Sequence, residues 1–231
     1  MIKTVLFDLD DTIFDFSRAE HVAISETFRA VGIEPTDEVT KLYSKINQEQ
    51  WERLQKNEID RDEVRIGRFR RLFTILGVSA DPNNTQKVYE YNLGSYYFYI
   101  DGAEELLEKL YGKYDLYIVS NGTTSVQDRR IAASGIGKYF KEIFISERVG
   151  YNKPSKQFFD YCTERIEGFD KDTAIIIGDS LTSDIQGGKN IGIKTCHYVR
   201  SGVIERGASG EVVPDFKVTS LSEIIPLLES L

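Results

Sequence analysis

The sequence predicts an α/β protein: a doubly wound parallel sheet into which a lobe of helices is inserted. Short apolar runs rich in β-branched residues alternate with helix-length segments along most of the chain, a rhythm typical of strands joined by crossover helices. The apolar runs end abruptly in polar residues, as buried parallel strands do at their carboxyl ends. One long interval near the N-terminus contains no strand-like run, which indicates an insertion.

The alternating part of the chain predicts strands and helices in turn. We expect strands at residues 3–7, 116–119, 143–145, 174–177, 194–199 and 216–218. We expect helices at residues 103–111, 125–133, 156–166, 183–190 and 221–231.

The interval that breaks this rhythm has a helical pattern throughout. Connections between a strand and the next helix ordinarily take about 2–6 residues, so an interval of this length predicts a lobe of its own. We expect a sheet core of residues 1–15 and 101–231 and a helical cap of residues 16–100, joined through residues 15–17 and 99–102. The helices of the cap are expected at residues 18–31, 36–57, 61–76 and 85–98.

Composition limits the partners and the location of the chain. It has 231 residues, 41% of them hydrophobic and 29% charged, with a formal net charge of −8. This charge disfavours general binding to nucleic acid or to anionic membranes, and no stretch approaches the ~18 apolar residues of a membrane span. The N-terminal MIKTVLFDLDD turns acidic too early for a signal peptide, and Cys162 and Cys196 do not make a disulfide framework. We expect a cytoplasmic protein with two buried thiols, either a monomer or a homodimer.

Charged residues gather where the predicted strands end, and ligands of open parallel sheets bind outside the carboxyl ends of the strands. Two like charges 4 Å apart repel by about 4 kcal/mol at an effective dielectric constant of about 20, so clustered carboxylates need a cation or a proton. An all-oxygen ligand set suits Mg²⁺, and the absence of His and Cys from the set disfavours Zn²⁺. We expect Asp8, Asp10 and Asp179 to bind Mg²⁺, beside Asp184 and Lys153.

A metal ion, a lysine and a hydroxyl donor together form a receptor for a phosphoryl group. A carboxylate can attack phosphorus to form an aspartyl-phosphate, and Asp8, directly at a strand end, is the expected nucleophile. Asp10 would protonate the leaving oxygen and then activate water. Lys153 would neutralise charge on the nucleophile and on the phosphate.

Further polar residues would support this chemistry. Ser120 is expected to donate a hydrogen bond to a phosphoryl oxygen, and Asn121 and Gly122 to bind the phosphate through backbone N–H groups. Asp184 would act behind the metal ligands, orienting Lys153 or a water molecule. Thr12 would cap a turn and stiffen the loop that carries the nucleophile.

The motifs FDLDDT, VSN, NKP and GDSLTSD, in this order at the strand ends, resemble those of the haloacid dehalogenase-like hydrolase superfamily. The resemblance covers essentially the whole chain. It implies a Rossmann-like core, a small helical cap after the first strand and a magnesium-dependent phosphoaspartate mechanism. It also implies the roles given above: Asp8 as nucleophile, Asp10 as acid and base, Ser120 and Lys153 at the phosphate, and Asp179 and Asp184 at the metal.

Finer features are similar to the pyrimidine 5′-nucleotidase branch of that superfamily. They are NGTTSVQDRRI after the second strand, FISERVGYNKPSKQFFDY around Lys153, and WERLQKNEIDRDEVRIGRF in the cap. They imply a small-molecule phosphate monoester, favoured to be a nucleoside 5′-monophosphate, as the substrate. One departure is that the return from the cap reads Ile100-Asp101-Gly102, where the branch often has Pro-Gly, so the hinge geometry is not carried over.

Other functions remain open or disfavoured. A sugar-phosphate phosphatase or a phosphomutase of the same superfamily stays open. A haloacid dehalogenase needs no metal and would not keep an acid at position 10. A receiver-type signalling module is too small for a long helical insertion after its first strand, and a catalytically dead scaffold would be expected to have lost an acid.

Two features of the cap have simple structural interpretations. Trp51 is most simply a core residue of the cap, with base stacking as the less favoured alternative. Arginines 65, 68, 70 and 71 lie on one predicted helix and are interpreted as a solvated face.

Overall fold

A computed structural model describes residues 1–56, 58–200 and 212–231. Within these residues, six strands form one parallel sheet with the order β3-β2-β1-β4-β5-β6. The strands are β1 (Thr4–Phe7), β2 (Asp115–Ser120), β3 (Glu142–Ile145), β4 (Ala174–Gly178), β5 (Lys194–Tyr198) and β6 (Phe216–Val218). The predicted Rossmann-like, doubly wound sheet is confirmed, including its last strand.

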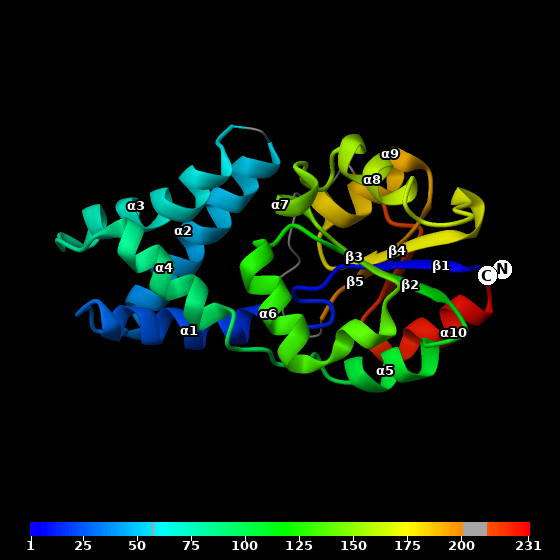
Figure 1. Cartoon of the computed structure of the whole chain (residues 1–231), viewed down its shortest axis with the longest axis horizontal. Coiled ribbons are helices and arrows are strands. Elements are labelled where there is room, and N and C mark those ends of the chain that lie inside the picture. The colour runs from blue at the N-terminus through cyan, green and yellow to red at the C-terminus, as the bar shows by residue number, and fades with distance from the viewer. Residues whose placement is uncertain (57, 201–211) are drawn as a thin grey trace.

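Helices cover both faces of the sheet because side chains alternate along each strand. Val5 and Phe7 of β1 pack in one buried cluster with α5 (Ala103–Leu110) and α10 (Ile224–Glu229). Leu6, between them, packs in another cluster with α8 (Lys156–Thr163). Figure 1 shows α5 and α10 on one side of the sheet and α8 with α9 (Gln186–Ile191) on the other.

The insertion forms a helical lobe at the end of the sheet opposite the chain termini (Figure 1). Its helices are α1 (Phe16–Ala30), α2 (Asp37–Gln55), α3 (Arg68–Leu76) and α4 (Pro82–Leu93), with a π-helical turn (Glu63–Gly67) leading into α3. The rings of Tyr43, Phe69 and Tyr89 meet in its core, with centroids 5.3–5.8 Å apart. The predicted limits of core and cap, residues 1–15 with 101–231 and residues 16–100, remain a proposal.

The two connections between sheet and lobe lie side by side. Asp15 accepts a hydrogen bond from the Arg18 N–H (2.9 Å) and caps α1, so the helix begins earlier than predicted. The last lobe helix spans Pro82–Leu93 rather than residues 85–98, because Asp81 caps its start. The returning chain is extended, and its Phe98 carbonyl accepts a hydrogen bond from the Asp15 N–H (2.8 Å). The outgoing and returning segments are therefore joined by a backbone hydrogen bond where the lobe begins.

Two expectations from composition can be compared with the structure. Cys162 and Cys196 are free and buried, as predicted, and burial raises the pKa of Cys196 to about 12. Among the described residues, none of the helices combines the length and the apolar character needed to cross a membrane.

Phe69→Ala should destabilise the lobe, because it removes a ring packed against Tyr43, Tyr89 and Phe73. We expect the free energy of unfolding to fall by about 3–5 kcal/mol. Urea unfolding followed by the fluorescence of Trp51, the only tryptophan, would measure it. Ile75→Ala on the same helix, where the side chain is 54% exposed, is the control. Equal stability of the two variants would contradict this account of the lobe core.

Candidate active site

The candidate site lies where the strand order reverses. From β1 the chain builds the sheet outward through β2 and β3 on one side and through β4, β5 and β6 on the other. Such a switch point opens a crevice at the carboxyl ends of the two central strands. Asp8 follows β1 and Asp179 follows β4, and the Asp8 N–H donates to the Ile177 carbonyl at 2.9 Å.

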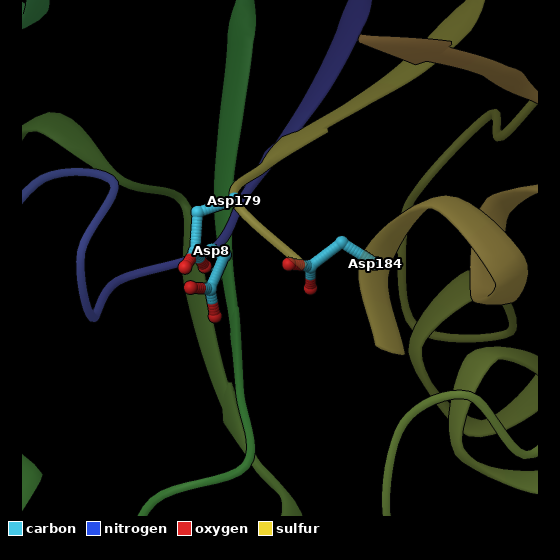
Figure 2. A group of neighbouring side chains, drawn as sticks. All are labelled: Asp8, Asp179 and Asp184. Atoms are coloured by element: carbon cyan, nitrogen blue, oxygen red, sulfur yellow. The ribbon is translucent and has the colours of Figure 1, made fainter. Parts of the chain in front are cut away.

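Three carboxylates converge in this crevice. Oxygens of Asp8, Asp179 and Asp184 lie within 4.8 Å of one another. Figure 2 shows Asp8 and Asp179 side by side and Asp184 pointing toward them from the turn after β4. Gly178 makes this approach possible, since a Cβ atom there would lie 2.3 Å from Oδ2 of Asp184.

Lys153 is the cation that balances part of this charge. Its Nζ donates to Oδ1 of Asp8 (2.5 Å), to Oδ1 of Asp184 (2.6 Å) and to the Val119 carbonyl (2.7 Å). Burial alone would lower the pKa of Lys153, but the carboxylates of Asp184 and Asp8 raise it above its usual value. Burial raises the pKa of Asp8 to about 8; Lys153 opposes this shift, and Asp184 and Asp10 add to it. Lys153 therefore stays charged, and its one positive charge offsets only part of the charge that the three carboxyl groups carry when ionised.

The donor set fits a hard divalent cation. All three side chains of the cluster offer oxygen and none offers nitrogen or sulfur, which suits Mg²⁺ rather than Zn²⁺. A divalent cation here would offset the mutual repulsion of these carboxylates, which adds to the effect of burial in raising the pKa of Asp8. Asp184, predicted to act behind the ligands, lies in the same cluster as Asp8 and Asp179.

The structure holds the Asp10 side chain in a different set of contacts. Its Oδ1 accepts from Arg130 (2.5 Å) and its Oδ2 from Nε2 of Gln127 (2.6 Å). Both partners are buried on α6 (Thr124–Ser134). Asp10, predicted to bind Mg²⁺ with Asp8 and Asp179, therefore has its carboxylate outside the acid cluster. The sequence did not indicate Arg130 and Gln127 as its partners. Their three-residue spacing places them on one helix face, and this spacing was the one sign in the sequence that they could act together.

The loop after β2 joins the lysine to the hydroxyl donor. Oγ of Ser120 accepts from the Gly122 N–H (3.1 Å) and from Gln127 (3.0 Å). Asn121 donates to the Lys153 carbonyl (3.0 Å) and accepts from the Lys153 N–H (2.8 Å). The Asn121 side chain therefore fixes the loop that carries Lys153. The N–H group of Gly122, predicted to bind phosphate, instead donates to Ser120 in its own loop.

Thr12 does not cap a turn as predicted. It is fully buried, and its hydroxyl makes no hydrogen bond with any part of the chain that the structure describes. Asp11 has the supporting contact instead, since its Oδ1 accepts from the Ser17 N–H (3.2 Å) at the start of α1.

A cavity of about 1380 Å³ opens over the acids and is roofed by the lobe. The predicted site residues that line it are Asp8, Asp10, Ser120, Asn121, Gly122, Lys153 and Asp179. One interpretation of the cap is wrong, and another is wrong for one of its residues. Trp51 lines this cavity and lies outside the lobe core that the described residues form. Arg70 and Arg71 are on a solvated face, 60% and 46% exposed, but Arg68 is 4% exposed because the helix turns it inward with Phe69 and Leu72.

The comparisons with known proteins identify the family. A family model described as haloacid dehalogenase-like hydrolase matches residues 5–198. The chain belongs to this family. It is 38% identical to the HAD-hydrolase YfnB of Bacillus subtilis, over 98% of this hydrolase and 95% of YfnB. It is 35% identical to the pyrimidine 5′-nucleotidase PynA of Streptococcus pneumoniae, again over 98% of this hydrolase and 95% of that relative.

A solved structure has the same fold over nearly the full length of this hydrolase. It is a magnesium-bound crystal form of YfnB, described as revealing interdomain movement, with 37% sequence identity and a TM-score of 0.92. The similarity covers 98% of each chain.

Arg61 connects the lobe of this hydrolase to both active-site loops. Its guanidinium donates to Oγ of Ser146 (2.8 Å) and to Oδ1 of Asn152 (2.5 Å), the residue before Lys153. Weaker contacts reach the carbonyls of Asn121 (3.5 Å) and Gly122 (3.4 Å). A single lobe side chain therefore touches the loops that carry the hydroxyl donor and the lysine.

Arg61→Ala should lower kcat/KM by about tenfold, the scale expected when a partly buried, charge-assisted hydrogen bond is lost. Steady-state kinetics on one phosphate ester would measure it. Arg53→Ala removes an arginine that is 44% exposed and paired only with Glu58 in the salt bridges described, and it should change kcat/KM less than twofold. The same loss in both variants would show that Arg61 does not position the loops.

Gly178→Ala should weaken divalent-cation binding, because the added methyl group would displace the Asp184 carboxylate. Perturbing the support of a metal site typically costs about 10–100-fold in affinity, and calorimetric titration with MgCl₂ would measure the change. Gly137→Ala is the matched control, since its Cβ atom would make only an ordinary contact, 3.4 Å from Ile131. Unchanged affinity in Gly178→Ala would contradict a cation site at this cluster.

Proposed function

We propose that this chain is a magnesium-dependent phosphomonoesterase that forms an aspartyl-phosphate on Asp8 and acts on nucleoside 5′-monophosphates. The observation that carries the proposal is the position of Lys153, which binds Asp8 and Asp184 together at the floor of the cavity. A buried carboxylate, a fixed ammonium group and a cluster of acids suited to Mg²⁺ are the parts that phosphoryl transfer to a carboxylate requires.

In the first step Asp8 attacks the phosphorus atom of the bound ester. Lys153 holds Oδ1 of Asp8, so Oδ2 forms the new bond to phosphorus. The bond between phosphorus and the leaving oxygen breaks, and that oxygen takes a proton from the carboxyl group of Asp10. Ser120 accepts two hydrogen bonds through Oγ, which leaves its own O–H to donate to a phosphoryl oxygen.

In the second step Asp10, now a carboxylate, takes a proton from a water molecule whose oxygen attacks the same phosphorus atom. The bond to Asp8 breaks, which restores its carboxylate and releases inorganic phosphate. Arg130 and Gln127 hold Asp10 in both steps through the contacts described above. Asp8, Asp179 and Asp184 would hold Mg²⁺, with Asp10 as a further predicted ligand. The bound ion would supply positive charge to the phosphoryl oxygens.

The relatives and the cavity support a nucleotide substrate. PynA is named for pyrimidine 5′-nucleotidase activity, and it matches this chain over nearly its full length. The cavity of about 1380 Å³ exceeds the ~300–1,000 Å³ of ordinary small-molecule pockets. Trp51 and Tyr89 line it on the lobe side. The space therefore suits a leaving group with a flat ring.

Asp8→Asn should abolish hydrolysis of p-nitrophenyl phosphate, with a loss of at least about 10³-fold because no other group replaces the nucleophile. Release of p-nitrophenol in the presence of MgCl₂ would measure it, and chelation of Mg²⁺ should abolish turnover of the unmodified protein reversibly. Asp160→Asn, on an exposed surface pair with Lys156, is the control. Undiminished turnover in Asp8→Asn would overturn the assignment of the nucleophile.

Nucleoside 5′-monophosphates should be better substrates than sugar phosphates. A panel of both classes, assayed with Mg²⁺ and compared by kcat/KM, would test this. A preference for sugar phosphates would keep the phosphatase mechanism and reject the proposed substrate class.

A further inference from the structure

A group of charged and polar side chains lies inside the helical lobe, beside its cluster of apolar and aromatic residues. Glu20 on α1 is 6% exposed, and Arg68 on α3 is 4% exposed. Asn47 on α2 links them: its Nδ2 donates to Oε1 of Glu20 (2.6 Å), and its Oδ1 accepts from Arg68 (2.6 Å). Ser44, one turn earlier on α2, donates to Oε2 of Glu20 (2.7 Å).

Burying such groups is costly unless they are hydrogen-bonded, and an apolar lobe core would not need them. Glu20, Ser44 and Arg68 all line the cavity over the active site, whereas the bridging Asn47 does not. The cluster therefore has its charged and hydroxyl groups at the cavity and its bridging amide behind them.

Arg68 and Glu20 can each make further hydrogen bonds, and together they suit a ligand edge that has both a donor and an acceptor. A guanidinium group has five N–H donors, and three bonds from Arg68 go to Asn47, Gln86 and the Arg65 carbonyl. A carboxylate oxygen has two lone pairs, so a bond accepted from the protein does not prevent a second from a ligand. Arg68 can thus donate to a carbonyl oxygen, and Glu20 can accept from an N–H group beside it.

Position within the cavity agrees with a role at the leaving group. Phe16, Glu20 and the reacting residue Asp10 all line the cavity, and Phe16 begins α1 directly after the loop of Asp10. Glu20 lies about one helical turn farther along α1, or about 5.4 Å. The ring of Tyr89 lies 4.7 Å from the Arg68 guanidinium and lines the same cavity. The polar cluster therefore lies beside the ring of Tyr89, on the lobe side of the cavity.

We propose that Glu20 and Arg68 determine specificity by binding the edge of a nucleobase that offers an N–H group next to a carbonyl oxygen. Glu20 accepts from the N–H group, Arg68 donates to the carbonyl oxygen, and Ser44 and Asn47 hold the two side chains in place. The inference rests on the proposed function, since it concerns the leaving group of the same reaction.

The test pairs one change in the substrate with one change in the protein. Uridine 5′-monophosphate has the N–H at ring position 3, N3-methyluridine 5′-monophosphate lacks it, and ribose 5-phosphate lacks the base. In the unmodified protein, kcat/KM should be about tenfold or more higher for the uridine ester than for its N3-methyl analogue, the scale of a hydrogen bond to a charged group. Glu20→Gln removes the charge but keeps an amide oxygen that can accept, so it should lower this ratio, a coupling that a purely structural role would not produce.

Glu26→Gln is the matched control, because it makes the same change on the same helix at a residue that accepts from Tyr96 (2.6 Å) and does not line the cavity. Its ratio should equal that of the unmodified protein. Arg68→Lys keeps the charge but loses the planar fork, and it should reduce the preference for the uridine ester over ribose 5-phosphate. Thermal melting of each variant would separate loss of folding from loss of recognition.

The possible failures are distinguishable. Absence of phosphate release from every ester would overturn the proposed function itself. Equal rates for the uridine ester and its N3-methyl analogue in the unmodified protein would overturn only the inference about Glu20. A Glu20→Gln ratio that stays at the unmodified value, or a Glu26→Gln ratio that falls equally, would overturn it as well.

Discussion

The site depends on one buried ammonium group held among carboxylates. Lys153 is 1% exposed and pairs with both Asp8 and Asp184, and removing one partner from such a buried pair leaves an uncompensated charge. Several other features follow from this constraint. The side chain of Asn121 fixes the lysine loop through two hydrogen bonds with the Lys153 backbone, and Gly178 leaves room for the Asp184 carboxylate. The one positive charge of Lys153 does not offset the charge of three ionised carboxyl groups. The cluster that is stabilised by Lys153 therefore also favours a divalent cation.

The sheet and its acids could be predicted from the sequence because both depend on local patterns. Apolar runs mark buried strands, and parallel strands bring their carboxyl ends to one edge, so Asp8 and Asp179 meet whatever the details of packing. The partners of Asp10 could not be predicted in this way. Arg130 and Gln127 reach Asp10 only because of the rotation of α6 about its own axis, which long-range packing decides. Arg68 shows the same limit, since its neighbours Arg70 and Arg71 are 60% and 46% exposed while it is buried.

A chain of polar contacts runs from the lobe interior to the sheet core. Arg68 donates to Gln86, Gln86 to Glu90 (2.8 Å), and Arg65 pairs with both Glu90 (2.6 Å) and Glu147 (3.4 Å). Glu147, on α7 (Ser146–Val149), accepts from the Thr124 N–H (2.6 Å) at the start of α6. Charged contacts of this kind depend on geometry and distance more strongly than apolar burial does. The position of the lobe therefore matters for the orientation of α6.

These contacts connect the side chains proposed to bind the two ends of the substrate, the base and the reacting phosphate ester. At one end, Glu20 and Arg68 face the space for the leaving group. At the other, α6 carries Gln127 and Arg130, which hold the acid that would protonate the leaving oxygen. Binding energy gained at a remote part of a substrate raises the rate only where it improves the geometry at the reacting atoms. A lobe with an entirely apolar interior could cover the cavity, but it would lack the polar contacts that run from Arg68 to the start of α6. These contacts connect the proposed base site to the helix that holds Asp10, which packing alone would not do.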